Sequence, residues 1–227
     1  MLDCHTHILP GIDDGAHDLT MAIGLCQLLA KQGVTEVVAT PHWCSPRFEV
    51  DDRRVLRAWK ALSDAVQTDV PGLILHLGSE HHLSGLQQPS AFVSSLRPLG
   101  SSSCVLVELP DDHVPHNAWQ TLREANRAGY RTYIAHPERC RGLSGAWGDL
   151  EAFIALGGRL QFDLGNLLGT HGWRMRWRAR RLFAHFAATS IIASDCHNLG
   201  VRAPQWDRLP AMWRRHVPAT LAELEGR

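Results

Sequence analysis

Apolar residues recur along the whole chain with two different spacings. Short runs rich in Val, Ile and Leu predict strands, whereas apolar residues three and four positions apart predict helices. The expected strands cover residues 2–8, 34–40, 73–77, 103–109, 132–135, 159–164 and 190–194. The expected helices cover residues 18–32, 51–68, 116–128, 147–156 and 173–188, and the C-terminus also reads as helical. Seven strands that alternate with helices favour parallel βα units, arranged as a barrel or as a doubly wound sheet.

Neither a repeat nor an evident linker divides the sequence, so we expect a single domain over residues 1–227. Hydrophobic residues make up 44% of the chain and charged residues 20%, which allows a sizeable core and argues against disorder. The 23 basic residues balance the 23 acidic ones. Bulk charge therefore gives no reason to expect a nucleic-acid or membrane partner.

Targeting signals are not evident in the sequence. The N-terminus carries no basic segment followed by an apolar one, so we expect no signal peptide. No apolar run approaches the roughly 20 residues that a membrane helix needs. The six cysteines are scattered and form no CxxC pair, which favours reduced thiols. These features predict a cytoplasmic protein.

Polar residues gather at, or just past, the carboxyl ends of the predicted strands. They are His5, His7, His42, Glu80, Glu108, His136, Asp195 and His197. In a barrel these strand ends converge on the active face, so residues far apart in sequence would meet. Taken singly, each of these residues is more often a loop histidine or an exposed carboxylate than a ligand. The GIDDG segment around Asp14 is by default a turn. As a set of five histidines and four carboxylates they favour a site for two or three metal ions.

The donor types narrow the chemistry of this site. A mixed set of imidazoles and carboxylates suits manganese, iron or zinc better than magnesium. Two-metal sites activate water near neutral pH and stabilise both oxygens of a phosphoryl displacement. The sequence therefore favours a phosphoester hydrolase.

Six motifs, in order along the whole chain, resemble the PHP (polymerase and histidinol phosphatase) family, and more closely its capsular polysaccharide branch of bacterial tyrosine phosphatases, the CpsB/CapC type. They are DCHTHILPGIDDGA at 3–16, ATPHW at 39–43, GSE at 78–80, VELP at 107–110, AHPER at 135–139 and SDCHN at 194–198. The LPGIDDGA segment separates this branch from histidinol phosphatases and polymerase-associated domains. The resemblance implies an α/β fold, a distorted TIM-like (β/α)7 PHP barrel with a trinuclear site.

The resemblance also implies roles for individual residues. The implied ligands are His5, His7, Glu80 and Asp195 for one ion, Glu80, Glu108 and His136 for a second, and Asp14, His42 and His197 for a third. Arg139 and Arg202 would bind the phosphate, a role that suits the guanidinium fork. We expect two to three divalent ions, with manganese favoured and iron, cobalt or zinc as alternatives.

The implied activity is that of a phosphoric monoester hydrolase acting on phosphotyrosine in proteins. A metal-bound hydroxide would attack phosphorus, and His42 is a weak candidate for the general acid. A tyrosine phenolate leaves more readily than an alkoxide, which lowers the need for such an acid. The implied partner is the tyrosine-rich tail of a tyrosine autokinase of polysaccharide biosynthesis.

Three alternatives remain open from the sequence. The same site could hydrolyse a small phosphomonoester such as histidinol phosphate, or the chain could be a metal-binding module without activity. The segment from Cys196 to Arg202 also has the C-x5-R spacing of thiolate-dependent tyrosine phosphatases. In addition, His81 and His82 after Glu80, and Cys140 after Arg139, depart from the usual pattern of the branch.

Overall fold

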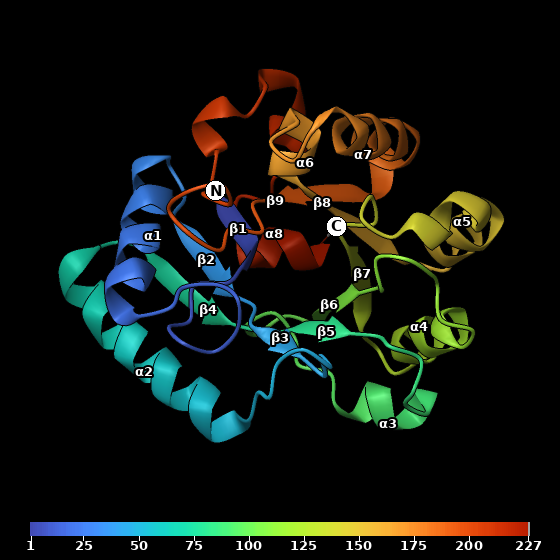
Figure 1. Ribbon diagram of the computed structural model, residues 1–227, viewed down its shortest axis with the longest axis horizontal. Coiled ribbons are helices and arrows are strands. Elements are labelled where there is room, and N and C mark those ends of the chain that lie inside the picture. The colour runs from blue at the N-terminus through green and yellow to red at the C-terminus, as the bar shows by residue number, and fades with distance from the viewer. Residues whose placement is uncertain (227) are drawn as a thin grey trace.

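The computed structural model describes residues 1–226, and Arg227, the last residue of the predicted domain, lies outside the described residues. Parallel strands lie inside a layer of helices, which gives the predicted α/β fold (Figure 1). The strands are β1 Leu2–Thr6, β2 Glu36–Ala39, β3 His42–Trp43, β4 Ile74–Leu77, β5 Glu80–His82, β6 Cys104–Glu108, β7 Arg131–Ala135, β8 Arg159–Asp163 and β9 Ser190–Ala193. The α-helices are α1 Leu19–Lys31, α2 Asp52–Asp69, α3 Pro89–Ser94, α4 Ala118–Arg127, α5 Trp147–Ala155, α6 Leu164–Leu168, α7 Trp173–Phe186 and α8 Leu221–Gly226. Short 3-10 helices cover Arg141–Gly145, Ala187–Thr189, Trp206–Arg208 and Ala211–His216.

The strands form two parallel sheets, in the orders β1-β2-β4 and β3-β5-β6-β7-β8-β9. β2 and β3 are separated by two residues, as are β4 and β5, so each pair continues one strand from the first sheet into the second. The far edges of the two sheets also meet, because Thr6 forms a parallel bridge with Cys196 and the amide of Asp195 donates to the carbonyl of His5 over 2.9 Å. Seven strand positions therefore surround the interior, as the resemblance to the PHP barrel implies, whereas the alternation of strands and helices alone also allowed a doubly wound sheet.

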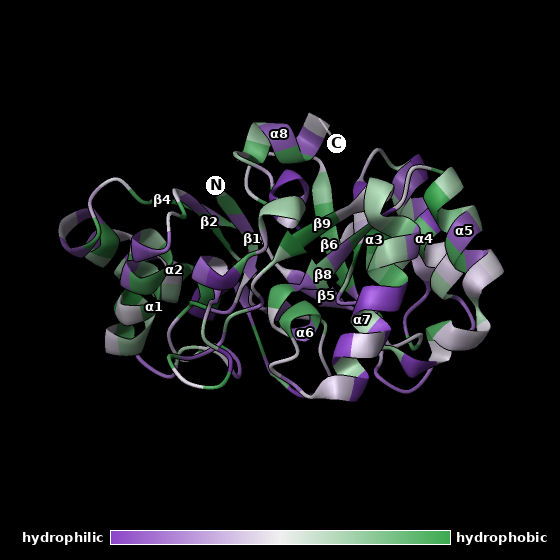
Figure 2. Ribbon diagram, turned by 90° about the horizontal axis from the view of Figure 1, so that it is seen from above, coloured by the Kyte–Doolittle hydropathy of each residue, from purple (hydrophilic) through white to green (hydrophobic). Residues whose placement is uncertain are grey.

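One end of this interior is filled by apolar side chains. Leu106, Tyr133 and Ile191 pack there with Leu221 and Leu224 of α8. The Tyr133 hydroxyl donates to the carbonyl of Leu224 over 3.3 Å, and Figure 2 shows α8 closing this end of the strands. Because apolar side chains fill this end of the interior, the carboxyl ends of the strands, at the opposite end, are free to carry polar side chains.

The outer helices pack their apolar faces on the strands. In α1, Asp18 accepts a hydrogen bond from the amide of Met21 and thereby caps the helix, as predicted, while Leu25 and Leu29 are fully buried. No helix within residues 1–226 is long and apolar enough to cross a membrane.

The sequence-based boundaries differ from the structure in two ways. The strand expected over residues 2–8 ends at Thr6, and the helix expected over 173–188 ends at Phe186. The short elements β3, β5, α3 and α6 are not predicted at all, because two to six residues are too few to show a periodic pattern.

Candidate metal centre

The structure brings all nine predicted ligands to the carboxyl ends of the strands. Side-chain donor atoms form four overlapping groups, and the atoms of each group lie within 4.8 Å of one another. These groups are His7-Asp14-His42-His197, His5-His7-Glu80, His5-His136-Asp195 and His42-Glu80-Glu108. The geometry regroups some of the residues of the resemblance-based assignment. His7 also lies in the group that contains Asp14, His42 also lies with Glu80 and Glu108, and His136 lies with His5 and Asp195.

Strand geometry explains why polar residues meet here. In β6, Cys104 and Leu106 face the apolar interior, and Glu108 follows on the same face at the carboxyl end. In β9, Ile191 and Ala193 have the same relation to Asp195, which lies just past the strand. The change from apolar to ionisable side chains along one face therefore marks the floor of the site.

Glu80 lies at the centre of the cluster. Its Oε2 atom is 3.4 Å from His5 Nε2, 3.3 Å from His7 Nε2 and 3.1 Å from His42 Nδ1. Its Oε1 atom is 2.7 Å from His136 Nε2. One carboxylate thus touches four imidazoles from three different strand positions, which suits a residue that bridges two ions.

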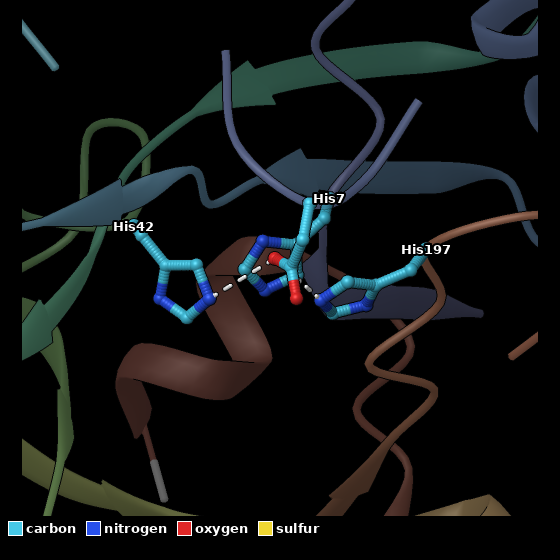
Figure 3. Close-up of side chains that lie close together, drawn as sticks. His7, His42 and His197 are labelled. Carbon is cyan, nitrogen blue, oxygen red and sulfur yellow. Dashed lines mark ion pairs between the residues drawn. The ribbon is translucent and has the colours of Figure 1, made fainter. Parts of the chain in front are cut away.

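Asp14 lies beside a second set of imidazoles. Its Oδ1 atom is 3.3 Å from both His42 Nε2 and His197 Nε2, and Figure 3 shows the rings of His7, His42 and His197 converging. The His7 and His197 rings stack with their centroids 3.9 Å apart. Because Asp14 is more exposed than the three histidines, this part of the cluster opens toward solvent.

Four buried atoms of the cluster have no hydrogen-bond partner within the described residues. They are His42 Nδ1, Glu80 Oε2, Asp195 Oδ1 and His197 Nε2. A buried polar atom without a partner is costly, and a buried carboxylate oxygen is especially so. Bound divalent cations would satisfy all four atoms, so the donor set fits metal ions.

Electrostatics hold two of the predicted ligands, Asp195 and His197, in the state that binds metal. Burial disfavours the charged form of Asp195, but Arg139 and His5 hold the pKa of its carboxyl well below the usual range. Burial, followed by the charge of His7, lowers the pKa of His197 to about 4. At neutral pH the carboxylate is therefore ionised and the imidazole is neutral, as metal coordination requires.

Backbone strain also concentrates at the cluster. Among described non-glycine residues, only Cys44, His136 and Asp195 have a positive φ, at 58°, 27° and 50°. Such conformations cost of order 1–3 kcal/mol each and persist where the surroundings over-determine them. Two of the three residues are predicted ligands, which supports a functional origin of the strain.

The two predicted phosphate-binding arginines converge on one atom. Arg139 Nη2 lies 2.5 Å and Arg202 Nη2 lies 2.9 Å from Asp195 Oδ2. Arg139 also donates to Asp163 Oδ2 over 2.9 Å. The two side chains are 20% and 24% exposed, so both are partly accessible at the edge of the cluster.

Several supporting residues are not selected by the sequence reasoning. Asp13 accepts from His7 Nδ1 over 2.8 Å, Gln161 accepts from His5 Nδ1 over 2.7 Å, and His82 donates to Glu108 over 2.9 Å. These contacts fix the orientation of the predicted ligands, as the hydrogen-bond partners of metal-binding side chains do. The sequence does carry a signal for Asp163, which ends β8 as Glu108 ends β6.

The two unusual histidines after Glu80 behave differently from each other. His82 contacts the cluster through Glu108. His81 faces away from it, since its Nδ1 atom contacts the carbonyl of Leu106 and its Nε2 atom accepts from the amide of Arg97. His81 is therefore a buried structural residue.

The thiolate alternative at Cys196 is wrong on structural grounds. Cys196 is fully buried in the hydrophobic core, and burial raises the pKa of its thiol well above the usual range. A thiol without access to substrate and without ionisation at neutral pH is a poor nucleophile. The C-x5-R spacing is a coincidence.

The chain is similar to proteins of known family. The sequence profile of the family described as "Capsular polysaccharide synthesis, CpsB/CapC" matches residues 1–223. The tyrosine-protein phosphatase YwqE of Bacillus subtilis is 31% identical over 207 residues, which cover 89% of this chain and 79% of the relative. The tyrosine-protein phosphatase CpsB of Streptococcus agalactiae is 23% identical over 208 residues, covering 90% and 86%.

A solved structure is similar over the full length. It comes from the crystal structures of YwqE from Bacillus subtilis and CpsB from Streptococcus pneumoniae, described as unique metal-dependent tyrosine phosphatases. Its TM-score is 0.81 at 28% sequence identity, with 100% of this chain and 87% of that chain covered. With a family match over nearly all residues and a convergent His and carboxylate cluster, the chain belongs to the CpsB/CapC family of capsular polysaccharide synthesis.

Proposed function

We propose that this chain is a metal-dependent protein-tyrosine phosphatase, a phosphoric monoester hydrolase. The observation that carries the proposal is the cluster of nine convergent donors, eight of them buried, with two arginines at its edge. The similarity to tyrosine-protein phosphatases supports the same activity.

The proposed ligands are the nine residues predicted from the sequence, and the proposed cofactor is two to three divalent ions, with manganese favoured over iron, cobalt or zinc. Such ions would lower the pKa of a coordinated water and offset the negative charge of the phosphoryl group. Asp13 and Gln161 fix the ring orientations of His7 and His5, so both imidazoles aim their Nε2 atoms at the proposed ions.

Arg139 and Arg202 are proposed to bind the phosphoryl oxygens. A guanidinium presents parallel N–H donors that match two oxygens of a phosphate. The buried carboxylate of Asp163 holds Arg139, which positions this donor before substrate arrives. The tyrosine phenolate, with a conjugate-acid pKa near 10, then leaves without a strong general acid.

The proposed substrate is a phosphotyrosine-bearing protein in the cytoplasm, and the proposed partner is the tyrosine-rich tail of a bacterial tyrosine autokinase. The resemblance to the capsular branch and the similarity to YwqE and CpsB support this partner.

The test combines metal analysis with activity. We expect the purified protein to contain divalent metal, to lose phosphotyrosine-peptide hydrolysis after treatment with EDTA, and to regain it when manganese is added back. We expect kcat/KM to be higher on a phosphotyrosine peptide than on histidinol phosphate. The reverse preference would assign the chain to small phosphomonoesters.

Two single-residue variants make this test more specific. His136→Ala should lose both metal and activity, because the imidazole contacts the central carboxylate of Glu80. His17→Ala, at an exposed histidine outside the cluster, should retain both. An active, metal-free His136→Ala protein would overturn the site.

A further inference from the structure

Helix α7 carries an unusual combination of side chains. It contains five arginines and two tryptophans and no acidic residue, in a chain whose total formal charge is zero. We propose that the exposed face of α7 is a docking surface for the acidic, tyrosine-containing segment that flanks the phosphotyrosine of a protein substrate. This inference rests on the proposed function for its substrate class.

The arginines of α7 are not used for internal ion pairs. Within residues 1–226, none of Arg174, Arg176, Arg178, Arg180 and Arg181 lies within ion-pairing distance of a carboxylate. Arg174 and Arg176 also lie in the first turns of the helix, where the helix dipole disfavours positive charge. The positive charge of this helix is therefore available to pair with carboxylates of another molecule.

The two tryptophans of α7 present flat surfaces to solvent. Trp173 is 74% exposed and Trp177 is 58% exposed. They are four residues apart, so they share one face of the helix. The guanidinium of Arg181 lies 5.3 Å from the ring centroid of Trp177 and 5.6 Å from that of Trp147 in α5. Aromatic rings alternating with cations suit a ligand that has both rings and carboxylates.

The docking surface adjoins the metal centre through two segments. Cys140 directly follows Arg139 and lines a surface pocket with Trp147, Trp177, Arg178 and Arg181. The second connection is His171, two residues before α7, whose Nδ1 atom lies 4.0 Å from Asp163 Oδ2. Asp163 itself holds Arg139. A peptide whose phosphotyrosine reaches Arg139 can therefore continue directly onto α7.

The chemistry favours a peptide over a lipid surface. The apolar face of α7 is already buried, since Leu182, Phe183 and Phe186 belong to the protein core. A helix that lies in a membrane needs such a face free for the acyl chains. What α7 exposes instead is charge along its length, visible as hydrophilic turns in Figure 2, with two isolated aromatic rings.

The experiment compares substrates that differ only in their flanks. The first variant is Arg174→Gln/Arg178→Gln/Arg181→Gln, and the second is Trp177→Ala. The control is Arg123→Gln/Arg127→Gln on α4, which removes two exposed arginines from another helix. Each protein is assayed with manganese on p-nitrophenyl phosphate, on a phosphotyrosine peptide flanked by Glu and Tyr, and on one flanked by Gly and Ser.

We expect KM for the acidic peptide to rise about tenfold in both α7 variants, because the triple variant loses three exposed charge contacts and Trp177→Ala loses an aromatic contact. Hydrolysis of p-nitrophenyl phosphate and of the neutral peptide should match the wild-type protein and the α4 control. The advantage of the acidic peptide should shrink in high salt. An equal loss on all three substrates, or no change on any, would overturn the proposal.

A binding measurement separates this proposal from the proposed function. Fluorescence anisotropy of the unphosphorylated acidic peptide should detect binding to the wild-type chain and weaker binding to the α7 variants. Binding without hydrolysis of any phosphopeptide would support the docking surface and refute the phosphatase. Hydrolysis indifferent to the flanks, with α7 variants that lose only binding to phosphatidylglycerol vesicles, would refute peptide docking and assign α7 to a membrane.

Discussion

At the scale of single residues, Glu138 is a buried carboxyl that holds residues next to the cluster in place. Its side chain is fully buried, and Oε1 accepts from the amide of Asp163 and from Asn166 Nδ2. Its other oxygen, Oε2, has no partner within the described residues. Burial, and then the charge of Asp163, raise the pKa of this carboxyl to about 7. The residue therefore ties Asp163, and through it Arg139, to the start of α6.

The raised pKa of Glu138 predicts a pH-dependent stability. Between about pH 4.5 and 7 the folded chain holds a proton that the unfolded chain has released, so stability falls as pH rises through this window. Glu138→Gln carries no ionisable proton and should flatten this fall. In the metal-free protein we expect it to gain up to about 3 kcal/mol relative to wild type at pH 8. Urea unfolding between pH 5 and 8 measures the difference.

The comparison for this prediction is Glu49→Gln, at an exposed glutamate. It should leave the pH dependence unchanged. If the free energy of unfolding changed with pH in the same way in the wild type and in Glu138→Gln, the raised pKa of Glu138 would be contradicted.

The site residues that the sequence predicts are those that end or follow a recognisable strand. Glu108 ends an apolar run and Asp195 follows one, so their position at the carboxyl ends of strands is predictable from the sequence alone. Asp13, Gln161 and Glu138 act through contacts with other side chains. Which partner each one meets depends on tertiary packing, and no local pattern encodes that.

At the scale of elements, the sequence pattern does not predict the shortest strands, and the reason is physical. β3 and β5 have two and three residues, and each resumes a strand after a break. Pro41 lies in one break and has no amide hydrogen for the ladder. The predicted run over residues 34–40 is right for β2, but nothing in it indicates that pairing resumes at His42. That resumption is what moves His42 and Glu80 beside each other.

The loop that carries Asp13 and Asp14 is held tightly against β1. The amide of Ala16 donates to the His7 carbonyl over 2.9 Å, and a Cβ at Gly15 would overlap the His7 backbone. We therefore expect Gly15→Ala to lower the free energy of unfolding by about 1–3 kcal/mol. It should also displace Asp14 and reduce the bound metal measured by elemental analysis. Gly145→Ala, where no atom lies within 4 Å, is the comparison. Equal midpoints of denaturation would refute this packing.

At the scale of the whole molecule, the metal centre joins strands from both ends of the chain. His5 lies near the end of the first strand and His7 just past it, whereas Asp195 and His197 follow the last strand. Without bound cations, the cluster combines buried carboxylates and unpartnered atoms. The folded state should therefore gain stability from any ion that binds it and not the unfolded chain.

This coupling predicts a metal-dependent melting temperature. In EDTA we expect Tm to be lower than with manganese, and to rise with the logarithm of the free metal concentration. At one hundred times Kd the gain is about 2.7 kcal/mol. Thermal denaturation across a manganese series measures it. A Tm that is the same in EDTA and in excess manganese would exclude an ion at this position.

The bridge between Thr6 and Cys196 has a consequence for how the protein is made. During synthesis, His5 and His7 leave the ribosome long before Asp195 and His197 exist. An ion cannot be enclosed until almost the entire chain has emerged, because the last strand completes the ring on which the first one depends. Loading of the proposed ions would therefore be a late, post-translational event, because a nascent chain interrupted before β9 has no complete set of the proposed donors.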